Sequence, residues 1–237
     1  MLYKIYSFLI ALPLFAVATI ITALVVILAS FCGDKKYACC HLTKWWSRIT
    51  LWLFLIPVSV EGRGHIDKRQ SYVFLANHQG YFDIFLMYAY LGHSFKWMMK
   101  EYLRRIPFVG LACERSGQIY VGDTRASMQT AVRRAQDTLR GGMSMVIFPE
   151  GTRTYDGTMN PFKKGAFTLA NEIGLPIVPL TINGSFRVFS RTARSVTRGP
   201  LTLTIHPAIT PEDRQGKPTR QLMQEVYDII AADLRQN

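Results

Sequence analysis

The sequence contains few cysteines, and their arrangement excludes two classes of protein. Only four of the 237 residues are cysteine: Cys32, Cys39, Cys40 and Cys113. They form no C-x-x-C pair and no framework of the kind that braces small secreted domains. We therefore expect reduced thiols facing the cytosol. None lies in a histidine motif typical of a thiolate nucleophile, so we expect no cysteine catalysis.

Histidine is also scarce, which argues against a metal enzyme. The five histidines are His41, His65, His78, His93 and His206. They form neither an H-E-x-x-H motif nor a cluster with cysteine at the spacing of a zinc site. We expect no metal and no other bound cofactor.

Acidic residues are outnumbered, with 16 Asp and Glu against 28 Lys and Arg and a net charge of +12. Such an excess favours anionic partners: phospholipid headgroups, phosphorylated cofactors, an acidic carrier protein or nucleic acid. No nucleic-acid recognition motif is present, so we expect no nucleic-acid partner. With 49% hydrophobic residues the chain is neither disordered nor fibrous.

Charge is absent from residues 5–33, where Leu, Ile, Val, Ala and Phe dominate. A helix needs about 20 apolar residues to cross a bilayer, so this run is long enough. Pro13 is expected to kink it. A cleaved signal peptide is the alternative, but the run is too long and breaks at Gly33-Asp34 without an A-x-A site. We expect a retained membrane segment.

A second apolar run, residues 51–60, is too short to span a membrane. Tryptophan beside Lys and Arg is typical of an interfacial segment, and such residues precede or enter this run. We predict a membrane anchor with an interfacial helix at 1–60 and a catalytic domain at 61–237. Basic residues after the anchor place that domain on the cytoplasmic side, at the inner or plasma membrane. The tryptophans are Trp45, Trp46 and Trp52, with Lys44 and Arg48 beside them. The basic residues that indicate the cytoplasmic side are Lys35, Lys36, Lys44 and Arg48.

Beyond residue 60, short β-rich runs alternate with helical patterns. This order predicts an α/β domain with a mixed, largely parallel sheet flanked by helices. Ligand sites in such sheets lie beyond the carboxyl ends of strands. Strands are expected at 71–77, 117–122, 143–148, 175–182 and 201–209, with helices at 82–91, from 125 to the Gly141-Gly142 stop, and at 221–234.

The stretch "NHQGYFD", residues 77–83, follows one expected strand. In a continuous helix, residues five apart point about 140° apart, so His78 and Asp83 would not meet. If a loop precedes a helix that begins near Tyr81, Asp83 lies in the first turn and leans back toward His78. The stretch then forms either a His–Asp general-base pair or a capped helix start with a polar loop histidine.

A second polar stretch, "FPEGTR", follows the buried strand at 143–148. Arg153 can bind a phosphate in bidentate fashion, and Gly151 permits close backbone approach. Glu150 can orient the arginine or receive a hydroxyl. The alternative is an ordinary turn with a solvated ion pair.

Together these stretches resemble the glycerolipid acyltransferases, in particular the 1-acyl-glycerol-3-phosphate acyltransferases. The N-H-x-x-x-x-D pattern is carried by Asn77, His78 and Asp83, and F-P-E-G-T-R is present without deviation. Between them, K-x-x-L…P-x-x-G is matched by Lys100, Leu103, Pro107 and Gly110, and a later V-P-L by residues 178–180. The resemblance covers roughly residues 60–210.

The resemblance implies acyl transfer from acyl-CoA or an acyl carrier protein thioester to lysophosphatidic acid at a bilayer. His78 would be the base and Asp83 its partner. The implied substrate-binding residues are Asn77, Lys100, Glu150, Gly151, Thr152 and Arg153. Alternatives are another acceptor, such as a lyso-aminolipid or dihydroxyacetone phosphate, or a non-enzymatic basic membrane-binding protein.

One position departs from the family pattern. Asp123 stands where the family carries an arginine associated with glycerol-phosphate binding, and Arg125 or Arg115 is the nearest substitute. Two basic segments remain. Residues 96–110 are expected either to graze headgroups or to form a core-facing helix end. Residues 187–199, with four arginines and no acid, are expected to meet anionic lipid or an acidic carrier protein, or to be a solvated loop.

Overall fold

A central seven-stranded sheet organises the computed structural model, which describes residues 1–31, 38–122, 124–140 and 142–235. The strand order is β1-β7-β6-β2-β5-β3-β4. Every neighbouring pair is parallel except β6 and β7, which are antiparallel. The mixed, largely parallel sheet is thus confirmed. The strands are β1 (Val58–Glu61), β2 (Val73–Ala76), β3 (Phe95–Lys100), β4 (Ile119–Val121), β5 (Ser144–Ile147), β6 (Ile177–Asn183) and β7 (Leu201–Ile205).

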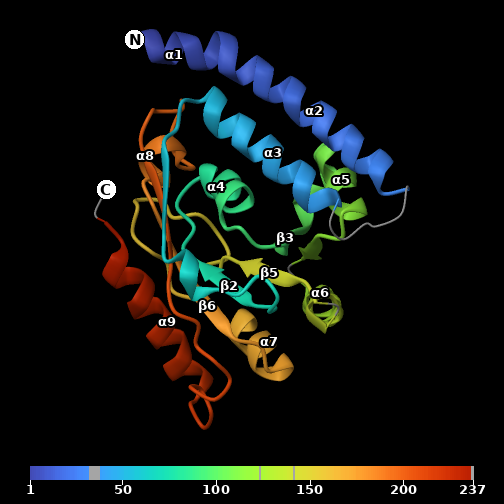
Figure 1. Cartoon of the computed structure of the whole chain (residues 1–237), viewed down its shortest axis with the longest axis vertical. Helices are drawn as coiled ribbons and strands as arrows, with labels where there is room; N and C mark the ends of the chain where they lie inside the picture. The colour runs from blue at the N-terminus through green and yellow to red at the C-terminus, as the bar shows by residue number, and fades with distance from the viewer. Residues whose placement is uncertain (32–37, 123, 141, 236–237) are drawn as a thin grey trace.

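Helices cover both faces of the sheet (Figure 1). On one side α2 and α3 lie side by side beyond α4, and on the other side lie α7 and α9. The helices are α1 (Leu2–Tyr6), α2 (Leu12–Ala29), α3 (Ala38–Leu53), α4 (Phe82–Tyr90), α5 (Val109–Arg115), α6 (Arg125–Arg140), α7 (Gly165–Ile173), α8 (Ser185–Phe189) and α9 (Thr219–Asp233), with a π-helix η1 (Ser7–Ala11) and 3-10 turns η2 (Arg63–His65) and η3 (Glu101–Arg105).

The central strand β2 shows why the two faces hold separate cores. All four of its residues are buried, as expected for a parallel strand covered on both sides. Phe74 and Ala76 point into a core shared with α3 and α4, whereas Val73 and Leu75 point into one shared with α6, α7 and α9. The period of two in the strand therefore divides a continuous apolar run between two helical layers.

The N-terminal run forms one nearly continuous helix from Leu2 to Ala29, with a mean hydropathy of 2.7 over an 18-residue window. By length and composition alone it could cross a membrane, and signal sequences meet the same criteria. The π-helical turn Ser7–Ala11 comes just before Pro13. Proline lacks an N–H and crowds the preceding turn, so a local change in hydrogen bonding is expected there. The helix is wider at this turn, and the kink expected at Pro13 stays a prediction.

The second apolar run is more deeply packed than an interfacial segment requires. Leu51, Phe54 and Ile56 are buried in the core, while Trp52 stays 73% exposed. The run is the end of α3 and the start of β1, which joins the sheet. The predicted boundary at residue 60 thus falls within β1 and stays a prediction.

Residues 96–110 are mostly strand and turn rather than a helix end. β3 and η3 occupy most of the segment, and α5 begins at Val109. Because the segment mixes charged and apolar residues without a clear period, the sequence did not reveal β3. Tyr102, Ile106 and Phe108 are exposed, so the expected contact with headgroups stays a prediction.

Candidate active site

The two motifs meet where neighbouring strands send their connections to opposite faces. After β2 the chain passes to α4 on one face, and after the adjacent β5 it passes to α7 on the other. In open α/β sheets, ligands bind at such a divergence, in the crevice beyond the carboxyl ends of the strands. "NHQGYFD" follows β2 and "FPEGTR" follows β5, so both lie at this crevice.

His78 and Asp83 form a short hydrogen bond, with His78 Nδ1 2.7 Å from Asp83 Oδ2. α4 begins at Phe82, so His78 lies in the preceding loop and Asp83 in the first helical turn. Asp83 Oδ2 also accepts hydrogen bonds from the amides of Gln79 and Gly80, at 2.8 and 2.9 Å. Because Asp83 Oδ2 is the acceptor for both amides, it is also the acceptor in its hydrogen bond with His78 Nδ1. The ring proton of His78 is therefore on Nδ1. Nε2 makes no hydrogen bond to any described residue and is left as the basic nitrogen.

Gly80 allows the loop to pack against the chain after β6. A Cβ on Gly80 would lie 2.5 Å from Ser185 O and 2.9 Å from Phe189 O. Both contacts are to backbone, which cannot move as a flexible side chain can. The close approach seats the His78 loop on the segment that carries α8.

Asn77 ties the same loop to β6. Its side-chain amide donates to Ile182 O at 2.9 Å, and its side-chain oxygen accepts from Ile182 N at 2.7 Å. Asn77 is 1% exposed. These are the contacts of a positioning residue, and the predicted role of Asn77 in substrate binding stays untested.

An aromatic wall supports the His78 ring. The ring stacks on Phe148, with 3.8 Å between centroids and 5° between planes, and Phe148 stacks in turn on Trp97. Only 14% of the His78 side chain is exposed. The imidazole is therefore held in one plane between an apolar wall and the Asp83 carboxylate.

Glu150 connects the second motif to the first from a buried position. Its Oε1 accepts from His78 N at 2.7 Å, and its Oε2 accepts from the backbone and side-chain amides of Asn160, each at 2.8 Å. Burial raises the pKa of Glu150 to about 7, and the three N–H donors hold that rise down because they favour the carboxylate. Its oxygens are occupied by these donors, so Glu150 is placed to position His78. The predicted substrate contact stays untested.

The raised pKa gives a testable pH dependence. A carboxyl with a pKa near 4.5 when unfolded and about 7 when folded binds more protons in the folded state between these values. Its contribution to the free energy of unfolding therefore falls as pH rises from about 5 to 8, by about 3 kcal/mol. Glu150→Gln lacks this titration. We expect the variant to gain thermal stability relative to wild type on going from pH 5 to pH 8, as measured by melting temperatures in one detergent. A constant difference between the two proteins would contradict this assignment.

The remaining FPEGTR residues surround the crevice. Gly151 has a φ of +72°, a left-handed conformation that glycine adopts without strain. The Arg153 guanidinium lies over the Tyr81 ring, 3.6 Å from its centroid, and Thr152 is exposed. Thr154 N donates to His78 O at 3.0 Å, so the loop is fixed directly to the base. Arg153 and Thr152 are thus beside His78 and accessible.

Lys100 and Arg115, one of the two candidate substitutes for the missing arginine, lie farther away. Lys100 ends β3, two strands from β2, or about 10 Å by strand spacing. Arg115 comes before β4 and lies over the Phe31 ring. It is therefore at the amino ends of the parallel strands, whereas the crevice is at their carboxyl ends. It is not brought to the site. Asp123 and the side chain of Arg125 lie outside the described residues.

The backbone amides that could bind an oxyanion are largely occupied. The amides of His78, Gln79 and Gly80 already donate to Glu150 or Asp83. These amides lie in the loop beside the base, close to where an oxyanion would form. The structure instead uses them to fix that loop.

Cysteine and metal chemistry find little support in the part of the chain that the structure describes. Cys113 is a free thiol, and burial raises its pKa to about 11. Cys32 and the side chain of Cys39 lie outside the described residues. No group of three or more metal-ligating side chains occurs among the residues described. The expected absence of a cofactor stays a prediction.

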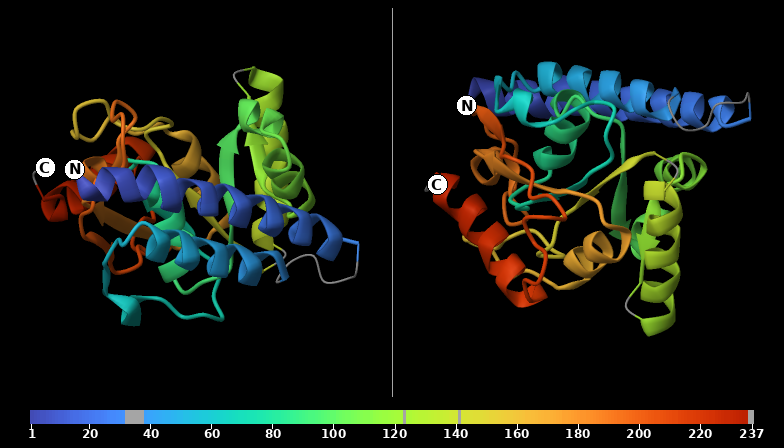
Figure 2. Two further views of the ribbon diagram at one scale, coloured as in Figure 1. Left: turned by 90° about the horizontal axis from the view of Figure 1, so that it is seen from above. Right: turned by 60° about the horizontal axis from the view of Figure 1, so that its bottom comes forward.

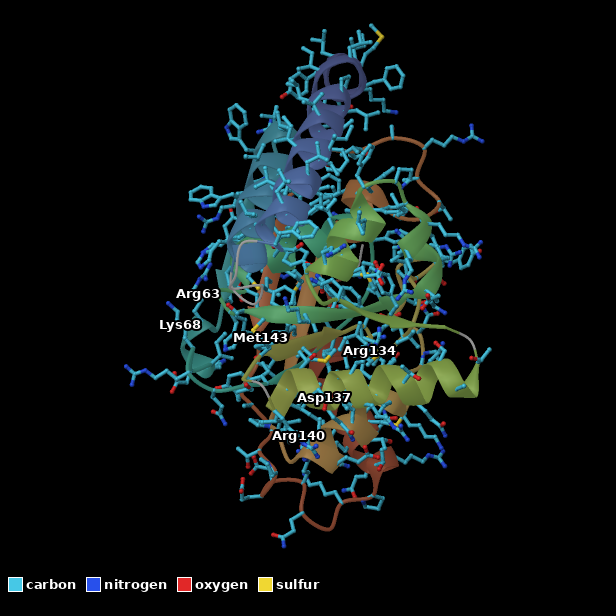
Figure 3. The ribbon with its side chains drawn as sticks, turned by 90° about the vertical axis from the view of Figure 1, so that its right-hand side faces the viewer. Arg63, Lys68, Arg134, Asp137, Arg140 and Met143 are labelled. Atoms are coloured by element: carbon cyan, nitrogen blue, oxygen red, sulfur yellow. The ribbon has the colours of Figure 1, made fainter. Side chains whose placement is uncertain are left out.

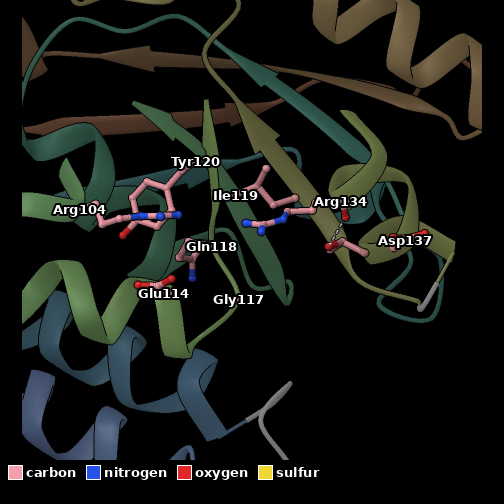
Figure 4. A pocket seen from close by; sticks show the side chains of 9 residues that line it. Arg104, Glu114, Gly117, Gln118, Ile119, Tyr120, Arg134 and Asp137 are labelled. Carbon is pink, nitrogen blue, oxygen red and sulfur yellow. Dashed lines mark hydrogen bonds between the residues drawn. The ribbon is translucent and has the colours of Figure 1, made fainter. Parts of the chain in front are cut away.

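A polar cleft of about 290 Å³ lies at edge strand β4, three strands from β2 (Figure 4). It lies between η3, α5 and α6 and mixes both signs of charge, with Arg104, Glu114, Arg134 and Asp137 among its lining residues. Figure 3 shows α6 crossing that side of the molecule, with Arg134, Asp137 and Arg140 along it. The cleft is separate from the His78 crevice and holds none of the motif residues.

Comparison with known proteins agrees with this arrangement. The family model described as Acyltransferase matches residues 57–183, more than half of the chain, and the chain belongs to this family. Within it, the chain is similar to proteins named 1-acyl-sn-glycerol-3-phosphate acyltransferase. It is 32% identical over 193 residues to the alpha form of Homo sapiens, a match that covers 78% of this chain and 68% of the human one.

Other matches are to plant and bacterial proteins. A chloroplastic 1-acyl-sn-glycerol-3-phosphate acyltransferase of Brassica napus is 31% identical over 172 residues, or 71% of this chain. The match spans about half of that relative, 49% of its length. The crystal structure of the 1-acyl-sn-glycerophosphate (LPA) acyltransferase PlsC from Thermotoga maritima superposes with a TM-score of 0.81 at 26% identity, covering 98% of this chain and 92% of that one.

Proposed function

We propose that this protein transfers a fatty acyl group from an acyl thioester to the sn-2 hydroxyl of 1-acyl-glycerol 3-phosphate, giving phosphatidic acid. The observation that carries the proposal is the 2.7 Å His78–Asp83 pair at the strand crevice, with Arg153 on the adjoining loop. The names of the relatives supply the acceptor. The thioester is a co-substrate, either acyl-CoA or an acyl carrier protein.

In this mechanism His78 Nε2 takes the proton of the acceptor hydroxyl as its oxygen attacks the thioester carbonyl. The tetrahedral intermediate collapses with loss of the thiolate, which receives that proton. Asp83 holds the proton on Nδ1 and stabilises the imidazolium. Arg153, with Thr152 and Gly151, binds the acceptor phosphate, and Lys100 assists from β3. Asn77 and Glu150 position the His78 loop.

The proposal is tested with purified full-length protein in detergent. Labelled palmitoyl-CoA and palmitoyl carrier protein are each offered with lysophosphatidic acid, a lyso-aminolipid or dihydroxyacetone phosphate. We expect phosphatidic acid to form from lysophosphatidic acid. Transfer only to another acceptor would support acyl transfer but show that lysophosphatidic acid is not the acceptor. Silence with every pair would remove the enzymatic proposal in favour of a basic membrane-binding protein.

We also propose that the N-terminal helices bind the bilayer. The outward side of the first helix is apolar and exposed, including Phe8, Leu9 and Leu28. Its inward side is hydrogen-bonded to α3 and the turn after it: Tyr6 OH donates to Leu53 O at 2.8 Å, and Trp46 Nε1 donates to Thr19 Oγ1 at 3.0 Å. A helix fixed in this way along the domain fits immersion in one leaflet better than a crossing.

Immersion in one leaflet predicts that both termini face the cytoplasm. Epitope tags fused at each end should be equally accessible to a protease from the cytoplasmic side of sealed vesicles. In a crossing arrangement, the N-terminal tag would be protected until detergent opened the vesicles. The basic residues after the helix are the reason for placing the domain on the cytoplasmic side.

A further inference from the structure

The loop after α8 sends one arginine across to the loop after β5. Arg191 Nη1 donates to Thr152 Oγ1 at 3.2 Å and to Arg153 O at 3.4 Å. Figure 2 shows these two loops side by side, near the end of the molecule where the chain begins. Arg191 therefore lies against the loop that carries Arg153, although the two are far apart in the sequence.

Both guanidinium groups are held by tyrosine rings. Arg153 lies 3.6 Å from the Tyr81 centroid, and Arg191 lies 3.9 Å from the Tyr155 centroid. A ring against one face fixes the plane of the guanidinium and leaves N–H donors free at its edge. Because the tyrosine rings carry no net charge, each guanidinium keeps its full positive charge and can bind an anion.

The two arginines are not ion-paired within the described part of the chain. Neither Arg153 nor Arg191 forms a salt bridge there with a carboxylate. The ammonium of Lys163 adds a third cation, since a Cβ on Gly151 would lie 2.7 Å from Lys163 Nζ. Three cations from two connections, β5–α7 and α8–β7, thus lie around residues 151–153.

We propose that Arg191 is a second phosphate-binding residue, which acts with Arg153 and favours a phosphomonoester over a phosphodiester. A phosphomonoester carries about 1.5 to 2 negative charges at pH 7 and three terminal oxygens, enough for two guanidinium groups. A phosphodiester carries one charge and offers two such oxygens. This inference rests on the proposed function and assigns its headgroup selectivity to a residue outside the recognised motifs.

Steady-state kinetics in neutral detergent micelles test the proposal. For Arg191→Gln we expect the KM for lysophosphatidic acid to rise about tenfold while kcat stays within about threefold, because a charge-assisted contact to the substrate is lost. Arg191→Lys should fall between the two. Arg194→Gln, the same charge change at an exposed position three residues on, is the matched control and should match wild type.

Three results would overturn the proposal. An unchanged KM in Arg191→Gln would show that Arg191 does not contact the substrate phosphate. An equal rise in Arg194→Gln would indicate a diffuse electrostatic effect. A fall in kcat alone, with a lower melting temperature, would make Arg191 a structural brace for the loop.

A binding measurement keeps this test separate from that of the proposed function. In a His78→Ala background, calorimetry compares lysophosphatidic acid with lysophosphatidylglycerol, a phosphodiester of one charge, at equal chain length. We expect the monoester to bind more tightly, and Arg191→Gln to remove most of that preference. If the His78→Ala protein that keeps Arg191 binds the two lipids equally, the inference is refuted. This result does not depend on whether the wild-type protein shows transfer activity.

Discussion

His78→Ala should abolish acyl transfer, lowering kcat by about 10³-fold while the protein stays folded. The magnitude follows from the usual contribution of a general base, about 10² to 10⁴. His78 is the only side chain at the crevice with a ring nitrogen held by a carboxylate among the residues described, so no neighbour can replace it. The measurement is the initial rate of phosphatidic acid formation from labelled acyl-CoA at saturating acceptor.

His78→Gln distinguishes lost chemistry from lost packing on Phe148. It keeps polar bulk beside the aromatic wall but has no basic nitrogen, so we expect it to be as inactive as the alanine variant. Circular dichroism and the melting temperature should stay near wild type in both. Activity within tenfold of wild type in either variant would exclude His78 as the base.

Asp83→Asn should lower kcat by about 10³-fold with little change in KM, because an orienting carboxylate acts on the transition state rather than on substrate binding. The amide keeps the shape of the carboxylate and can still accept from Gln79 N and Gly80 N. It lacks the negative charge that stabilises the His78 imidazolium. The change therefore isolates charge from geometry.

Asp137→Asn supplies a matched control for this variant. Asp137 is exposed on α6, beside the separate cleft at β4, and its neutralisation should leave the rate unchanged. If Asp83→Asn instead raises KM with kcat preserved, the carboxylate serves substrate binding and the proposed pair is not the base.

Sequence patterns predicted the sheet well where the strands are buried and apolar. β2, β5 and β6 were expected because their runs are short, β-rich and bounded by turn formers. β1 was missed because its residues continue an apolar run begun in α3, which periodicity cannot divide. β3 was missed because Lys96 and Lys100 interrupt its apolar pattern. Lys96 is buried, and its ammonium is bound by the carbonyl of Ser116.

For the site, local spacing allowed the His78–Asp83 contact as one of two arrangements, because His78 lies in a short loop and Asp83 in the helical turn that follows it. Contacts between distant segments could not be read in this way. Arg191 reaches Thr152 from 39 positions away, through a loop whose path depends on the whole fold. The four arginines at 187–199 were visible as charge, but nothing local distinguished Arg191 from the other three.

The pairing of Asn77 with Ile182 has a consequence for how activity is regained after unfolding. The two residues are 105 positions apart, so the loop that carries His78 takes its final place only after β2 and β6 have come together. Contacts of such high sequence separation form slowly, because loop closure must precede their gain in free energy. A shift of one residue would also turn every side chain of the strand to the opposite face. Recovery of catalysis during refolding would therefore report completion of the central sheet, whereas helical circular dichroism would return earlier.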